Sequence, residues 1–172
     1  SIVGYGWSLS VPSIERVSRY GVDDLYTSTT FSSSLSGELE DVSLTDTTHG
    51  AYGAKIDDGS FLTYSYGTDE TWTVTDKHGM TYVFGAFDDD RLSDPSDTTR
   101  VFRWMLSEVR DGNDNVVTYS YQKNGNQIYP LAINYTGNGS AAGIFDVGFS
   151  LETRADVAES FAAGFSVETA YR

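Results

Sequence analysis

Residues 70–85 read ETWTVTDKHGMTYVFG, and this stretch decides the fold class. Its first half alternates Trp72 and Val74 with threonines, which is the period of a β-strand with one buried face. Lys77-His78-Gly79 then supplies turn residues, with a glycine for the positive φ that tight turns require. A second alternating run follows and ends at Phe84. The stretch therefore predicts an antiparallel β-hairpin.

The same pattern recurs along the chain. TYSY occurs at Thr63–Tyr66 and again at Thr118–Tyr121, with the variant TYVF at Thr81–Phe84. Residues 100–122 predict a second hairpin, in which DGNDN at Asp111–Asn115 forms the turn. Apolar residues occupy both faces of its first strand, as in a strand that lies between two packed layers. We interpret the repeated tetrapeptide as the return strand of a recurring hairpin unit.

Other segments carry weaker patterns. Tyr26–Gly50 is rich in serine and threonine and predicts a long, irregular connection, whereas Ala86–Thr99 predicts an acidic surface loop. Arg154–Ala163 is the one segment in which we expect a short helix. Further strands are expected at Tyr129–Tyr135, Ile144–Glu152 and Phe165–Tyr171.

Composition supports one all-β domain over residues 1–172, an antiparallel hairpin-repeat sheet with little or no helix. Aromatic residues make up 14% of the chain and glycines number 17, which suits strands separated by turns. The last residues are strand-like up to Arg172 without a closing turn. We therefore expect the chain to be a fragment of a longer protein.

The charge and the absence of cysteine exclude several classes of function. A formal net charge of -14 disfavours nucleic acids and anionic membranes, because binding would bring like charges together. No apolar run approaches the roughly 20 residues that span a bilayer, so membrane insertion is not expected. Without cysteine there is no disulfide, zinc–thiolate site or cysteine nucleophile. Low lysine with abundant threonine, serine, glycine and tyrosine favours an exported surface or toxin protein.

Two acidic segments are candidate calcium sites. Asp111–Asn115 begins like an EF-hand loop, but Val116 and Gln122 occupy the sixth and twelfth positions, where glycine and glutamate are required. A hairpin turn explains this segment better. Asp88–Asp90 could gather oxygen ligands together with the aspartates that follow it. A solvated loop is the favoured interpretation there, and calcium remains the alternative.

No catalytic residue emerges from the sequence. His49 and His78 each precede a glycine and lack metal-ligand spacing, and no GxSxG nucleophile elbow is present. Glu38-Leu39-Glu40 follows Thr27-Ser28-Thr29, an order that brings mono-ADP-ribosyltransferases to mind. The spacing is too short for two separate strands, and we reject that match. We predict a protein that is not an enzyme, with no catalytic, cofactor-binding or metal-binding residue.

The tryptophans allow two interpretations. Trp7, Trp72 and Trp104, together with the tyrosines, could form a platform for sugar rings, because aromatic faces stack on pyranoses. Within alternating strands such residues more often fill a core, where each buries a large apolar area. The core interpretation is favoured, and a surface adhesion or carbohydrate-binding module stays as the alternative function.

Four blocks in order resemble the SpvB/TcaC-type N-terminal domain, which also begins the B component of Tc insecticidal toxin complexes. GYGWSLSVPSIERVSRYG at Gly4–Gly21 is similar to its opening signature. WTVTDKHGMTYVFG and residues 91–121 resemble its two strand pairs, and the latter is also similar to the YD (Rhs) repeat. RADVAESFAAGFSVETAYR at 154–172 resembles the block that follows. The chain departs from the family in Tyr26–Ser60, where only the Leu-Ser-Gly of SSSLSGELED is retained.

The resemblance implies a secreted bacterial protein of toxin type. It implies a non-catalytic domain that forms part of a β-sheet shell, continued by YD repeats, which encloses or presents a C-terminal toxic domain. The implied partners are the remainder of its own chain and other toxin-complex components. A first piece of such a shell would leave an unpaired strand edge, so we expect self-association or edge pairing.

Overall fold

The computed structural model describes residues 9–43, 48–57 and 59–172. In these residues every regular element is a β-strand apart from two 3-10 turns, η1 (Val22–Asp24) and η2 (Asp88–Asp90), which confirms the all-β prediction. None of the described residues form a helix long and apolar enough to cross a membrane. The strands are β1 (Ser13–Arg16), β2 (Phe31–Ser33), β3 (Gly37–Asp41), β4 (Gly50–Ala54), β5 (Thr63–Tyr66), β6 (Trp72–Thr75), β7 (Thr81–Phe84), β8 (Arg91–Asp94), β9 (Asp97–Arg110), β10 (Asn115–Asn124), β11 (Gln127–Asn138), β12 (Phe145–Gly148), β13 (Thr153–Ser160) and β14 (Val167–Tyr171).

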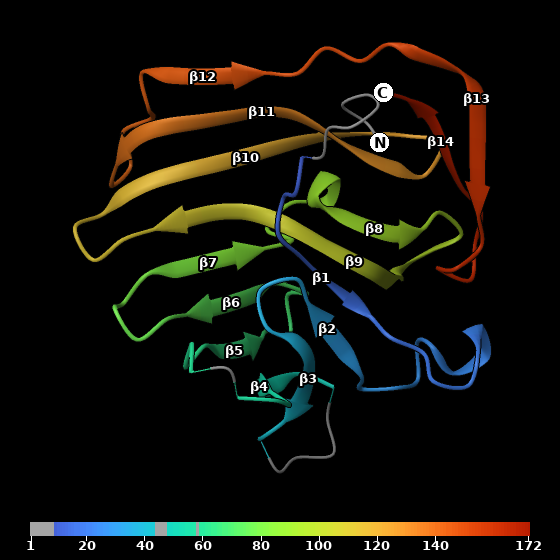
Figure 1. Ribbon diagram of the computed structural model, residues 1–172, viewed down its shortest axis with the longest axis horizontal. Coiled ribbons are helices and arrows are strands. Elements are labelled where there is room, and N and C mark those ends of the chain that lie inside the picture. The colour runs from blue at the N-terminus through green and yellow to red at the C-terminus, as the bar shows by residue number, and fades with distance from the viewer. Residues whose placement is uncertain (1–8, 44–47, 58) are drawn as a thin grey trace.

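Eight of these strands close into an antiparallel barrel. Strands β1 to β7 pair in chain order, β7 then pairs with β9, and β9 returns to β1 (Figure 1). The closing pair sets Ile14 of β1 opposite Trp104 of β9. The hairpin predicted at residues 70–85 is β6–β7, with Trp72 opposite Phe84. Closure leaves no free edge within the barrel wall.

The long strand β9 connects the barrel to a second sheet. Arg110 near its end pairs with Thr81 of β7 on one side and with Val116 of β10 on the other. Strands β10, β11 and β12 continue outward from this point as a three-stranded extension, which we call the outer sheet (Figure 1). Strand β8 pairs with the first half of β9, and β13–β14 form a separate hairpin. β9 is therefore paired at both edges where β8 and β1 meet it, at Arg103 and Trp104, and again where β7 and β10 meet it, at residues 108–110.

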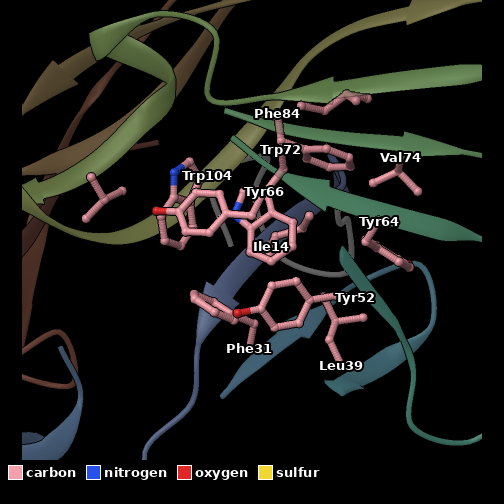
Figure 2. Close-up of a cluster of buried hydrophobic side chains, with 12 residues drawn as sticks. Ile14, Phe31, Leu39, Tyr52, Tyr64, Tyr66, Trp72, Val74, Phe84 and Trp104 are labelled. Atoms are coloured by element: carbon pink, nitrogen blue, oxygen red, sulfur yellow. The ribbon is translucent and has the colours of Figure 1, made fainter. Parts of the chain in front are cut away.

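Aromatic rings fill the barrel. Phe31 lies at the centre, with ring centroids of Tyr52, Tyr66, Trp72 and Trp104 at 5.0–5.8 Å in edge-on arrangements (Figure 2). Tyr66 stacks on Trp72 at 4.4 Å, with an interplanar angle of 8°. Such ring pairs each add about 0.5–1.5 kcal/mol beyond the area they bury. The tyrosines of the first TYSY tetrapeptide are thus core residues of a return strand.

A smaller cluster attaches the C-terminal hairpin to the barrel. Tyr26, which follows η1, donates its hydroxyl hydrogen to the carbonyl oxygen of Ala163 at 2.6 Å. Burial is the main reason that the pKa of Tyr26 rises to about 12, so the hydroxyl keeps its proton near neutral pH. The buried members of this cluster are Leu25, Leu92, Phe102, Ala163, Phe165 and Val167.

The segment Tyr26–Gly50 is not the irregular connection that its composition predicted. It contains strands β2 and β3 of the barrel wall. Strand β2 pairs with β1, and β3 pairs with β4. Phe31, Ser33 and Leu39 are buried. Serine and threonine lowered the apparent apolar content, but small side chains suit the narrow turn between β2 and β3.

Ala86–Thr99 was also predicted wrongly as a surface loop. It forms η2, the strand β8 and the start of β9, and it buries Asp90 and Asp94. Asp90 accepts a hydrogen bond from the Ser107 hydroxyl at 2.5 Å, and Asp94 accepts from Arg100 at 2.9 Å. Partners within the fold therefore replace water around these two carboxylates.

Burial raises the pKa of Asp90 above its ordinary value, with the neighbouring Asp89 charge adding to the effect. The folded state therefore holds this proton more tightly than the unfolded state does. Its contribution to stability is greatest at low pH and falls as pH rises from about 4 through the raised value. We expect Asp90→Asn to gain stability relative to the wild type over that window, measured by urea denaturation at a series of pH values.

Asp111 provides a control of opposite sign. Hydrogen bonds from the side chain and backbone of Asn115 hold the pKa of Asp111 below its usual range. Its stabilising contribution is present above the unfolded value and is lost as pH falls through the lowered one. Equal pH dependence in Asp90→Asn and Asp111→Asn would contradict both assignments.

The short helix expected at Arg154–Ala163 is absent. The residues form β13 and the turn after it, and β13 pairs with β14, with Glu159 opposite Glu168. Long-range packing decides the outcome, because β14 presents Val167 to the cluster that holds the hairpin on the barrel.

Candidate functional site: the outer sheet

The outer sheet exposes a row of apolar side chains on one face. Register places Tyr119, Ile133 and Val147 side by side across β10, β11 and β12. Tyr135 and Phe145 form the next pair, with stacked rings 5.7 Å apart. Tyr119 packs against the barrel core, whereas Phe145 and Val147 are 52% and 45% exposed. The row therefore runs from the packed core out to solvent.

Strand β12 is the end of the large sheet. In the described part of the chain it pairs with β11 alone, and all four of its residues are exposed. Its second edge presents backbone N–H and C=O groups to solvent. An exposed edge beside apolar side chains is a surface that readily accepts another strand.

A fixed loop sets the position of β12. The Asn134 side chain donates to the Gly143 and Phe145 carbonyls at 3.0 and 3.2 Å, and its oxygen accepts from the Gly143 amide at 2.8 Å. A Cβ at Gly143 would lie 1.9 Å from the Tyr135 oxygen, so only glycine fits. These contacts hold β12 against β11 over a pairing of four residues.

The two acidic segments considered as calcium sites lie at a hairpin turn and at η2. Asp111 accepts hydrogen bonds from the amides of Asn113 and Asn115 at 2.8 and 2.9 Å, which confirms a hairpin turn. Asp88–Asp90 is η2, with Asp88 exposed and Asp90 turned toward Ser107. Across the residues that the structure describes, no three His, Cys, Asp or Glu side chains gather closely enough to hold a metal ion.

The two histidines have different surroundings. The amide of His78 donates to Asp76 in the β6–β7 turn, as predicted. His49 lies 3.0 Å from a carboxylate oxygen of Glu70, and its ring lies 4.6 Å from that of Tyr66. The hydroxyl of Tyr66 donates to the other oxygen of Glu70. Glu70 itself adopts φ 63°, a conformation that a non-glycine residue keeps only when its surroundings hold it.

The sequence did not predict this His49–Glu70–Tyr66 contact. The signal was weak, because three elements contribute to it and Glu70 resembles any turn acid. Trp104 also donates its indole N–H to the Glu70 carbonyl at 2.9 Å. We interpret these contacts as a structural group that fixes the turn at Glu70 against the barrel.

The tryptophan alternatives are partly decided. Trp72 and Trp104 have no exposed surface, so neither can stack on a sugar. Trp7 lies outside the described residues. The two glutamates of Glu38-Leu39-Glu40 are on β3, with Leu39 buried between them.

Comparison with known families now decides the resemblance. Residues 60–140 match the sequence model of SpvB, described as "Salmonella virulence plasmid 65kDa B protein". The resemblance to SpvB is confirmed. The SpvB match covers β5 to β11, from the barrel wall into the outer sheet. Among curated proteins, no sequence matches the chain.

Solved structures share the same fold. The N-terminal domain of the effector protein SpvB from Salmonella typhimurium strain LT2 superposes with a TM-score of 0.76 at 18% identity, over 96% of this chain and 74% of that one. The TcdB2-TccC3-Cdc42 complex gives 0.77 at 18% identity, and the Photorhabdus luminescens Tc holotoxin pore gives 0.71 at 19%. The chain spans about three quarters of the SpvB structure but only 11% of the matched chain in each of the two Tc structures.

Proposed function

We propose that the chain is a non-catalytic structural domain of a secreted bacterial toxin-type protein. In this proposal residues 1–172 are one SpvB-like β domain, and the outer sheet continues into a larger β-shell built by later parts of the same chain, with repeats of YD type. The shell encloses or presents a C-terminal toxic domain, and other toxin-complex components dock to the assembled protein.

The observation that carries the proposal is the outer sheet itself. The barrel closes its own wall, yet β10 to β12 leave it and end in an exposed edge beside Tyr135, Phe145 and Val147. A sheet that exposes both an edge and an apolar row gains stability when further strands cover them. The SpvB match and the shared fold with Tc structures support this role.

Val147→Lys tests whether the outer sheet is an interface. We expect the 172-residue chain to self-associate with rising concentration in analytical ultracentrifugation, because edge pairing can bury the exposed row. A lysine on β12 should shift the chain toward monomer, since pairing would bury its charge. Val42→Lys is the matched control, because Val42 is 56% exposed and lies after β3, away from the outer sheet.

A wild type that stays monomeric at high concentration would contradict this interface. The enclosing role has its own test, in which the chain is expressed within its native reading frame and treated with trypsin. We expect the C-terminal domain to be cleaved only after the shell is denatured. Cleavage at the rate of the isolated domain would overturn the shell while leaving the interface standing.

A further inference from the structure

A polar groove lies on the outer surface of the barrel, away from the outer sheet. It has a volume of about 450 Å³, within the roughly 300–1,000 Å³ of typical small-molecule sites. It is lined by the loop after β1, the residues just before β2, strand β3, and Lys55, which directly follows β4. Its charged and aromatic lining residues include Arg19, Tyr20, Glu38, Glu40 and Lys55.

One aromatic ring at this groove has no packing role. Tyr20 is 90% exposed, the largest value among the exposed large apolar and aromatic side chains of the described residues. Its loop is nevertheless held in place. The Val17 amide donates to the Thr30 carbonyl at 3.0 Å, and the Ser18 hydroxyl donates to Asp24 at 2.8 Å. Because the loop is already held in place, a ligand can stack on the exposed Tyr20 ring with little loss of loop conformational entropy.

The charged groups beside the ring are held in position before any ligand arrives. Glu38 accepts hydrogen bonds from Arg19 and from Lys55, the latter at 2.9 Å. These two bonds, that from Lys55 first, hold the pKa of Glu38 below its ordinary value. The carboxylate is therefore ionised and oriented between two cations.

The balance of charge indicates what kind of molecule would fit. Two cations and three carboxylates line the groove, the third being Asp41, which gives a formal charge of -1. A phosphate or a strongly cationic ligand would meet groups of its own sign. A neutral molecule with neighbouring hydroxyls suits it better, because each hydroxyl donates to a carboxylate and accepts from Arg19 or Lys55.

We propose that this groove binds a neutral saccharide, with one pyranose ring stacked on Tyr20 and its hydroxyls on Glu38, Glu40 and the two cations. Aromatic rings suit one face of a sugar because the C–H groups of that face are apolar. The site is separate from the shell role, and it gives the domain a means of contacting glycans. Its residues belong to the part of the chain that precedes the SpvB-matched region.

Titration followed by amide NMR tests the proposal on the 172-residue chain. The probes are methyl β-D-glucopyranoside, methyl β-D-galactopyranoside and N,N′-diacetylchitobiose at millimolar concentration. We expect at least one to shift the amides of Arg19, Tyr20, Glu38 and Lys55. Tyr20→Ala should weaken that binding about tenfold, as the loss of one aromatic contact predicts, whereas Tyr20→Phe keeps the ring and should retain binding.

We expect the Tyr20 variants to fold like the wild type, because the Tyr20 side chain is exposed and contributes nothing to the core. Phe87→Ala is the matched control, since Phe87 is 68% exposed beside η2 and outside the groove. Retained binding in Phe87→Ala is expected. The proposal is overturned if none of the three saccharides shifts these amides, or if Tyr20→Ala binds as well as the wild type.

Discussion

Trp104→Ala is expected to lower the free energy of unfolding by about 3–5 kcal/mol, the range for a large buried aromatic residue. Trp104 is fully buried, and its ring packs against Phe31 and Tyr66. It also lies on β9 at the pair that closes the barrel, opposite Ile14. Denaturation in guanidinium followed by circular dichroism measures the change.

The two phenylalanine variants separate packing from hydrogen bonding. Trp104→Phe removes the donor to the Glu70 carbonyl, whereas the buried indole N–H of Trp72 has no hydrogen-bond partner among the described residues. Trp72→Phe therefore removes an unsatisfied group together with its ring area. We expect Trp104→Phe to destabilise by about 1–3 kcal/mol more than Trp72→Phe. Equal losses would show that the Trp104 hydrogen bond contributes nothing to stability.

Arg16→Met is expected to destabilise the fold by about 2–4 kcal/mol, because it leaves two backbone acceptors without donors. The Arg16 guanidinium donates to the carbonyls of Val101 and Ser28 at 2.9 and 3.0 Å and lies 5.0 Å from the Phe31 ring centroid. Arg16 is only 8% exposed, and no carboxylate of the described residues forms an ion pair with it. Carbonyls and rings thus hold this charge inside the fold.

Arg16→Lys should be nearly as destabilising, because one ammonium group cannot reproduce the planar fork that reaches both carbonyls. Arg19→Met is the control. Its side chain is 52% exposed and its ion pair with Glu38 lies at the surface, where such pairs contribute at most about 1 kcal/mol. If Arg16→Met were no less stable than Arg19→Met, the buried guanidinium would have no structural role.

Local pattern predicted the hairpins well. In residues 63–66 and 72–75, strict alternation identified which side chains face the core, and Tyr64, Tyr66, Trp72 and Val74 are all buried. The turn at Asp111–Asn115 was also predicted, because short polar residues and glycine satisfy their own backbone there. These features depend on neighbours in the sequence, so the sequence displays them directly.

Closure of the barrel could not be predicted in this way. The pair between Ile14 and Trp104 joins residues far apart in the chain, and no local period reports it. Strand β8 was missed for a related reason, since its aspartates looked solvated until Ser107 and Arg100 were placed beside them. The groove at Tyr20 likewise depends on segments that meet only in the folded state.

The closing pair of β1 and β9 has a consequence for the order in which the chain can fold. During synthesis β1 to β7 emerge first, but β1 cannot find its second neighbour until residues 103–105 have left the ribosome. Until then the incomplete wall has two unpaired strand edges, one on β1 and one on β7, and β7 carries Tyr82 and Phe84. Non-local pairings of this kind form slowly, and exposed borders favour mispairing between nascent chains. The yield of native protein should therefore depend on how fast the ribosome translates the segment before β9.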